Sequence, residues 1–167
     1  MQRSAKKIAV LGLCTSLAMI LAYVEILLPP LFVAVPGIKL GLPNIAIIFI
    51  LYRFGVKDAA AVSLVRIFAV SLLFGNPMTF AYSIAGGVLS LAAMALLKKT
   101  DLFSMVGVSV VGGVLHNAGQ ILTAMLLLET LELGYYMIVL TVTGTVSGVF
   151  VGLCGAFAVK HVKIPHV

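Results

Sequence analysis

Several polar and charged side chains that could recognise a ligand lie inside long apolar segments of this chain. Arg66 stands near the middle of one such segment, and Glu25 lies near the end of another. His116, Asn117 and Gln120 follow one another within a single turn of a predicted helix and share a face. A charge near the centre of a bilayer costs about 3 kcal/mol, so ionisable residues in such positions are candidates for function.

These side chains suit a small, anionic ligand. A guanidinium and an imidazole bind carboxylate or phosphate groups, and Lys39 adds a third basic group. A concave apolar pocket with a few convergent polar groups is the usual form of a small-molecule site. The candidate substrate-binding residues are Glu25, Lys39, Asn44, Arg66, Asn76, His116, Asn117 and Gln120. The alternative is a buried structural network, in which Arg66 pairs with Glu25 and the amides form hydrogen bonds between helices.

Motifs for other chemistry are missing. The sequence contains no phosphate-binding G-x-x-x-x-G-K-[ST] loop, no G-x-S-x-G, no H-E-x-x-H and no C-x-x-C. Its five acidic residues are scattered, so no aspartate-rich cluster could hold the magnesium ions of a diphosphate substrate. We therefore expect no catalytic residues, no metal site and no bound cofactor in this chain.

The composition identifies the environment of these residues. The chain has 167 residues, of which 62% are hydrophobic and 10% charged, and its mean hydropathy is +1.24. Soluble domains average about 45–50% apolar and about 25% charged residues. A chain of this length cannot bury so much apolar surface on its own. The composition excludes a soluble monomer and predicts an integral membrane protein.

Six apolar segments can be distinguished, and a membrane-spanning helix needs about 20 such residues. They cover residues 8–28, 43–54, 56–74, 78–97, 102–128 and 135–159. We predict an all-α, polytopic membrane protein with a single domain of six transmembrane helices over residues 1–167. The first segment is interpreted as a retained helix and not as a signal peptide, because it contains Glu25 and ends in two prolines.

The positions of the basic residues predict the orientation. Nine of the eleven fall at the two chain ends or on the second and fourth connections: Arg3, Lys6, Lys7, Arg53, Lys57, Lys98, Lys99, Lys160 and Lys163. Because basic residues accumulate on the cytoplasmic side, we expect a multi-pass protein of the cell membrane with both termini in the cytoplasm. The net charge of +6 thus indicates topology, and no nucleic-acid partner is expected.

The least regular stretch is residues 29–43, with four prolines and two glycines. It is apolar, unlike a solvated linker. We expect it either to enter the outer half of the membrane as a lid over the ligand or to form an interfacial loop. The segment that follows it is only about 18 Å long as a helix, too short to cross a bilayer alone.

Small residues at four-residue spacing predict where helices approach one another. The sixth segment carries Gly144, Gly148 and Gly152, and the fourth carries overlapping pairs between Ser83 and Ser90. We expect both to pack within the bundle. Gly12 and Ser16, in the first segment, either pack in the same way or meet a partner protein. Gly112-Gly113 leaves room for a ligand or a helix, and Cys14 and Cys154 are expected to be free, buried thiols.

An ordered set of motifs resembles one known family over nearly the whole chain. The motifs are PGIKLGLPNI at residues 36–45, VRI and SLLFG between 65 and 75, SIAGG at 83–87, and GVS and HNAGQ between 107 and 120. They are similar to the Gx transporter family, which is also catalogued as heptaprenyl diphosphate synthase component I. That family resembles the substrate-binding S components of energy-coupling-factor (ECF) vitamin transporters. The resemblance implies a bundle of six helices with cytoplasmic termini.

The resemblance also implies partners. In S components, a face of small residues on the first helix docks on the energising module, and Gly12 and Ser16 stand at that position. The expected function is capture of a small cofactor precursor, anionic or prenyl-bearing, for uptake powered by separate ATPase and transmembrane coupling subunits. The alternatives are a non-catalytic membrane subunit of a prenyl diphosphate, quinone-synthesis or redox assembly, and a prenyltransferase component. The transporter interpretation is favoured because the chain lacks the clustered aspartates of prenyl chain elongation.

Overall fold

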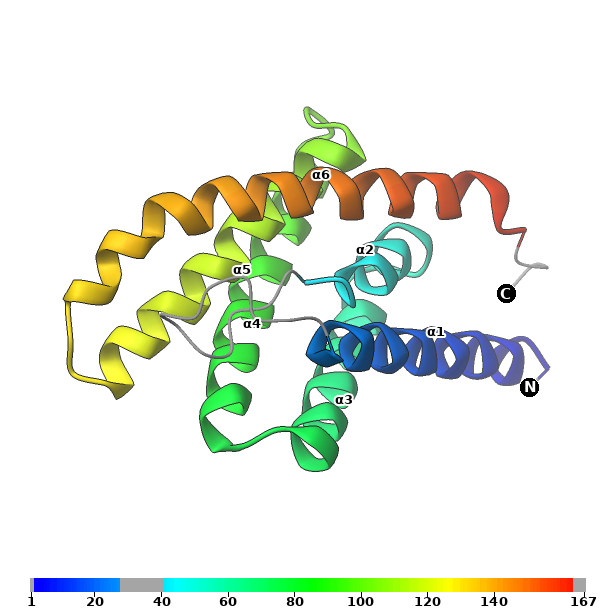
Figure 1. Ribbon diagram of the computed structural model, residues 1–167. Coiled ribbons are helices and arrows are strands. Elements are labelled where there is room, and N and C mark those ends of the chain that lie inside the picture. Colours follow the sequence, from blue (N-terminus) through cyan, green and yellow to red (C-terminus); the bar gives the residue numbers. More distant parts are fainter. Residues whose placement is uncertain (1, 28–40, 164–167) are drawn as a thin grey trace.

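A computed structural model of the protein describes residues 2–27 and 41–163 and places them in six α-helices and one short 3-10 helix (Figure 1). The elements are α1 (Gln2–Leu27), α2 (Asn44–Arg53), α3 (Val56–Phe74), α4 (Pro77–Thr100), α5 (Met105–Leu127), η1 (Glu132–Tyr136) and α6 (Met137–His161). No β-strand occurs in these two ranges. The all-helical prediction is confirmed for them, and each predicted segment corresponds to one α-helix.

Local signals in the sequence set several helix boundaries. Gly55, between α2 and α3, has a φ of +102°, which an L-residue with a side chain rarely adopts. Asn76 and Thr79 form a reciprocal capping box at the start of α4, with Pro77 as the first helical residue. The Ser104 hydroxyl accepts a hydrogen bond from the Gly107 N–H and caps α5. These turns explain why the predicted boundaries lie close to the observed ones.

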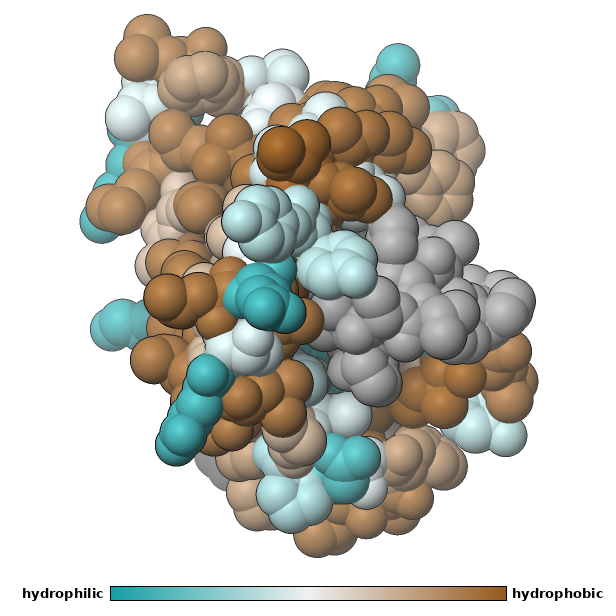
Figure 2. Space-filling view, turned by 60° about the vertical axis from the view of Figure 1, so that its left-hand side comes forward, coloured by the Kyte–Doolittle hydropathy of each residue, from teal (hydrophilic) through white to brown (hydrophobic). Residues whose placement is uncertain are grey.

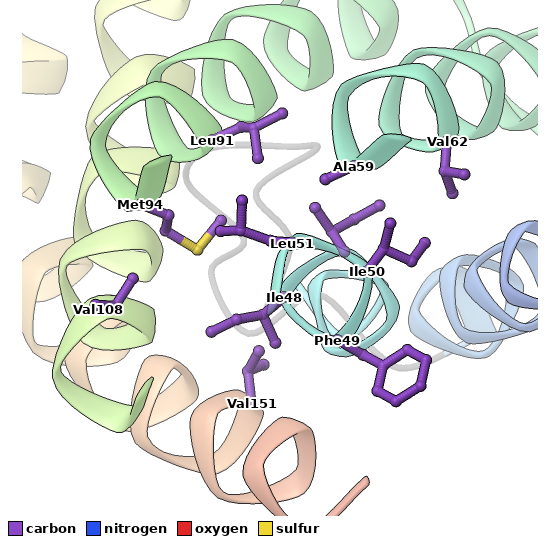
Figure 3. Close-up of a cluster of buried hydrophobic side chains, with 11 residues drawn as sticks. Ile48, Phe49, Ile50, Leu51, Ala59, Val62, Leu91, Met94, Val108 and Val151 are labelled. Atoms are coloured by element: carbon purple, nitrogen blue, oxygen red, sulfur yellow. The ribbon is translucent and has the colours of Figure 1, made fainter. Parts of the chain in front are cut away.

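Helix α2 occupies the centre of the molecule. Every side chain from Ala46 to Leu51 is buried, as expected for a helix that is apolar on all sides. Figure 3 shows α2 end-on, with Leu51, Ile48 and their neighbours directed at the surrounding helices. The side chains that meet it are Ala59 and Val62 of α3, Leu91 and Met94 of α4, Val108 of α5 and Val151 of α6. The short second segment is therefore enclosed by protein.

Helix α5 lies between α4 and α6 and packs closely on both. A Cβ atom added to Gly148 of α6 would come within 2.6 Å of Val110 Cα, and one added to Gly119 of α5 within 2.9 Å of Gly86 Cα in α4. Such contacts require glycine, because the neighbouring atoms belong to the backbone. The packing predicted for the fourth and sixth segments is confirmed. Neighbouring helices come close to Gly112 and Gly113, where room for a ligand or a helix was predicted. The Met94 side chain of α4 lies against Gly112, and the Gly144 backbone of α6 lies against Gly113.

Helix α1 lies along α3 and is held at both ends. Lys7 forms an ion pair of 2.8 Å with Asp58 at the start of α3, and the Tyr23 ring lies 5.0 Å from that of Phe74 at its end. Ala18 and Ala22 are buried between these contacts. Much of the remaining surface of α1 is exposed, including Leu13 at 72%.

Large apolar side chains cover much of the outer surface, as Figure 2 shows for one face. An exposed apolar surface of this extent is typical of a protein in contact with lipid. Four helical stretches have the length and hydropathy to cross a membrane: Ala5–Leu27, Pro77–Thr100, Met105–Leu127 and Glu132–His161. Helix α2 is too short to meet these criteria, and α3 carries three charges within its 19 residues. The membrane class is supported, and the count of six crossings stays a prediction.

The start of α1 and the end of α6 lie on the same side of the molecule (Figure 1), and basic side chains on the ends of α2 and α4 bond to helix-end carbonyls. Arg53, at the end of α2, donates hydrogen bonds of 2.7 Å to Val159 O in the last turn of α6 and of 2.9 Å to Val162 O directly after that helix. Lys98, near the end of α4, donates one of 2.6 Å to Leu51 O. These side chains satisfy carbonyls that a helix end leaves without partners, a structural role that charge counting did not predict.

Candidate functional site

Glu25 and Arg66 bring two opposite charges into the packed interior, from α1 and α3. Glu25 is 8% exposed and Arg66 7%, and the two side chains attract each other electrostatically. The Glu25 carboxylate also accepts a hydrogen bond from the N–H of Gly41, directly before α2. This arrangement brings three separate parts of the chain together around two buried, opposite charges.

The described residues do not satisfy every hydrogen-bond donor of the Arg66 side chain. Its Nε and Nη2 atoms are fully buried and have no hydrogen-bond partner among the described residues. Leaving a buried donor unpaired costs about 1–3 kcal/mol, and more for a charged group. The guanidinium therefore keeps recognition capacity beyond its interaction with Glu25.

His116 and Gln120 form a second polar group, on the side of α5 that faces α4. Their Nε2 atoms lie 3.3 Å apart, and both side chains are buried. Gly86 of α4 packs against this pair: a Cβ atom there would come within 3.1 Å of His116 Nδ1. The Gln120 Oε1 atom is buried without a hydrogen-bond partner among the described residues, so this amide also retains an acceptor.

The Asn117 side chain points toward α6, away from His116 and Gln120. Its amide donates a hydrogen bond of 2.9 Å to Leu140 O in α6 and approaches Thr143 Oγ1 at 3.5 Å. One residue corresponds to a rotation of about 100° around a helix, which turns this side chain from α4 toward α6. His116 and Gln120 therefore face α4, whereas Asn117 faces α6, although all three were predicted to share one face. Asn117 makes a hydrogen bond between helices, as the structural alternative proposed for the amides.

A small polar cavity lies among α2, α4, α5 and α6. Its volume is about 10 Å³, close to the minimum for one water molecule. Half-buried Asn44 lines it, together with the hydroxyl-bearing Ser90, Ser109 and Ser147. Ser90 Oγ is buried without a hydrogen-bond partner among the described residues. Sequence reasoning missed these serines, although small polar residues on the buried faces of apolar helices are a recognisable signal.

The remaining two substrate-binding candidates contribute no geometry to the interior. Asn76 is exposed, and its side chain caps α4 by accepting from Thr79 N at 2.9 Å. Lys39 lies outside the described residues, as does most of the predicted lid at 29–43. Within the described ranges, no three His, Cys, Asp or Glu side chains are grouped so that they could hold a metal ion.

The two candidate docking residues lie on an open face of α1. Gly12 and Ser16 are exposed, and a Cβ atom added to Gly12 would meet no atom of residues 2–27 or 41–163 within 4 Å. A neighbouring apolar groove of about 350 Å³ runs between α1, α2 and α6 and is lined by Leu13, Cys14, Phe49 and others. Cys14 and Cys154 are free, as predicted, and half-buried.

Comparison with known proteins identifies the family. No curated protein and no solved structure is significantly similar to this chain. One family model, described as heptaprenyl diphosphate synthase component I, matches residues 14–158. The match includes α2 to α5 in full, the second half of α1 and most of α6. On this evidence of sequence, the chain belongs to the heptaprenyl diphosphate synthase component I family.

Proposed function

We propose that this protein is the substrate-binding subunit of a membrane uptake system, similar to the S components of ECF transporters. It captures a small cofactor precursor from outside the cell, and separate ATPase and transmembrane coupling subunits supply the energy. The basic end of the bundle faces the cytoplasm in this proposal, because basic residues accumulate on that side of membrane proteins.

The observation that carries the proposal is the buried guanidinium of Arg66, two atoms of which have no hydrogen-bond partner among the described residues. A bundle that needed only stability would gain little from a buried charge pair, since apolar residues of similar volume are often as stable. Charged side chains inside membrane helices more often mark the path or the site of a substrate. Two buried Arg66 atoms with unused donor capacity fit a site that a ligand completes.

The open face of α1 supports a separate energising partner. Gly12 and Ser16 present a flat strip of helix that no part of the described bundle covers. Small residues of this kind let a second helix approach closely in a membrane. A docking surface for a coupling subunit needs this exposure, whereas the comparable strip on α6 is already occupied by α5.

Co-purification from native membranes tests the proposal. We expect the tagged protein to bring down paired ATPases and a transmembrane coupling protein, and Gly12→Leu to abolish their recovery while the variant stays folded. Ala61→Leu is the matched control, because Ala61 is a small exposed residue on α3 and its enlargement should leave the complex intact. Complete recovery with Gly12→Leu, or no ATPase with the wild-type protein, would contradict the proposal.

A second candidate rests on the family description, which names a component of heptaprenyl diphosphate synthase. In this candidate the protein is a non-catalytic membrane subunit of a prenyl diphosphate or quinone-synthesis assembly. The same experiment separates the two functions: consistent recovery with a prenyltransferase subunit, and without ATPases, would favour the synthase subunit.

A further inference from the structure

The guanidinium of Arg66 lies deep in the bundle, and one edge of this planar group has no hydrogen-bond acceptor among the described residues. Arg66 lies about 15 Å along α3 from the start of that helix, among the buried side chains of Val62, Ser63 and Val70. Its two atoms without hydrogen-bond partners among the described residues are Nε and Nη2. In arginine these two atoms share one side of the planar group, and their N–H bonds point in parallel.

An edge with two parallel donors matches a group that has two acceptor oxygens. Arginine binds carboxylates and phosphates through such paired hydrogen bonds, which are short and strong because both partners are charged. Glu25 supplies a countercharge for Arg66, and one of its oxygens already accepts from the Gly41 N–H. The Nε–Nη2 edge remains without an acceptor from the described residues.

Charge balance limits what this edge can accept. Among the described buried residues, Glu25 and Arg66 are the two that carry a full charge at neutral pH, and they balance each other. A ligand with one negative charge leaves a net charge of about one in a weakly polar interior. A diphosphate would leave two or three, and separating or concentrating charge in such an interior is expensive.

We propose that the Nε–Nη2 edge of Arg66 binds a singly charged group with two oxygens, that is, a carboxylate or a phosphodiester. The inference rests on the proposed binding function and narrows it: the ligand is a monocarboxylate, or a molecule whose acid group is balanced by its own cation, and not a prenyl diphosphate. The same chemistry is present in the phosphodiester of a lipid headgroup, so the two sources must be separated by experiment.

Thermal unfolding of the wild-type protein in a maltoside detergent, which carries no acid group, tests the inference without any mutation. The probes are hexanoate, its neutral isostere hexanamide, inorganic diphosphate and short-chain dihexanoyl-phosphatidylcholine. We expect hexanoate to raise the melting temperature at concentrations at which hexanamide has no effect, and diphosphate to protect no better than hexanoate. Protection by phosphatidylcholine and not by hexanoate would support the edge and assign it to lipid.

Two variants locate the effect. Arg66→Lys keeps the positive charge and loses the paired donors, so we expect hexanoate to bind at least about tenfold more weakly. Arg53→Lys is the control at the basic end of the bundle and should bind as the wild type does. Equal protection by hexanoate and hexanamide, together with no protection by phosphatidylcholine that Arg66→Lys weakens, would overturn the inference, as would diphosphate binding that is tighter than hexanoate binding.

Failure here can be distinguished from failure of the proposed function. A protein that co-purifies with ATPases but shows no preference for the carboxylate contradicts only the ligand class. A protein that binds hexanoate through Arg66 but has no ATPase partner keeps the ligand class and loses the transport function.

Discussion

Helices α1 and α6 both carry small residues at four-residue spacing, and their surroundings are opposite. Gly144, Gly148 and Gly152 of α6 each lie against the backbone of α5, at distances that leave no room for a Cβ atom. Among the described residues, a Cβ atom added to Gly12 of α1 would have no neighbour within 4 Å, and the Ser16 hydroxyl donates a hydrogen bond of 3.1 Å to Gly12 O in its own helix. The same local pattern thus forms a closed seam in one helix and an open strip in the other.

The difference has a physical consequence for the two halves of the molecule. The seam between α5 and α6 gains dispersion energy along its whole length, because glycine lets the backbones touch. Helix α1 is attached by the buried Ala18 and Ala22 and by contacts near its ends. One half is therefore suited to rigidity, and the other leaves a surface for a partner.

The largest loss of stability is expected from a substitution that separates α5 from α6. Gly148→Leu places a side chain where a Cβ atom alone would come within 2.6 Å of Val110 Cα. We expect a loss of about 3 kcal/mol or more in the free energy of unfolding, since neither backbone can move without separating the helices. Gly12→Leu is the matched control on the open strip and should change the value by less than about 0.5 kcal/mol. Reversible unfolding in mixtures of mild detergent and SDS measures both, and similar losses in the two variants would refute the comparison.

An intermediate loss of stability is expected when the hydrogen bond of Asn117 across the seam is removed. Asn117→Leu removes the hydrogen bond from the Asn117 amide to Leu140 O in α6 while keeping a side chain of similar size. Hydrogen bonds between membrane helices contribute about 1 kcal/mol, so a loss of this order is expected in the same unfolding assay. Thr141→Val serves as the control, because exposed Thr141 bonds only to Met137 O in its own helix. A loss as large as that of Gly148→Leu would show that this polar contact stabilises the seam as strongly as the glycine packing does.

The smallest effect is expected from loss of the ion pair that links the start of α1 to α3. Lys7→Ala removes the ion pair with Asp58, in which the lysine side chain is 39% exposed. Partly exposed pairs contribute about 0.5 kcal/mol and are screened by salt. We expect faster hydrogen exchange in the first turns of α1 at low salt, and a smaller difference from the wild type at about 1 M salt. Lys99→Ala, at an exposed lysine of the same end, should leave the exchange unchanged; an equal effect at both salt concentrations would argue against the ion pair.

The sequence predicted the burial of the interior candidate residues better than it predicted their arrangement. The burial of Glu25, Arg66, His116, Asn117 and Gln120 follows from their positions within apolar segments. Their division did not follow, because His116 and Asn117 are adjacent in sequence yet face different helices. Asn76 was predicted as a ligand-binding residue, and the turn chemistry beside Pro77 indicates its capping role equally well.

The apolar composition, the positions of the helices and the placement of the basic residues can all be read from the sequence. These properties depend on composition and on local breaks such as Gly55 and the Asn76-Pro77 turn, which act within a few residues. Long-range packing places α2 at the centre, covers the strip on α6 and leaves that on α1 open within the described bundle. It also leaves one edge of Arg66 without an acceptor among the described residues. Periodicity defines a face of a helix, but the neighbour of that face is set by packing between residues far apart in the chain.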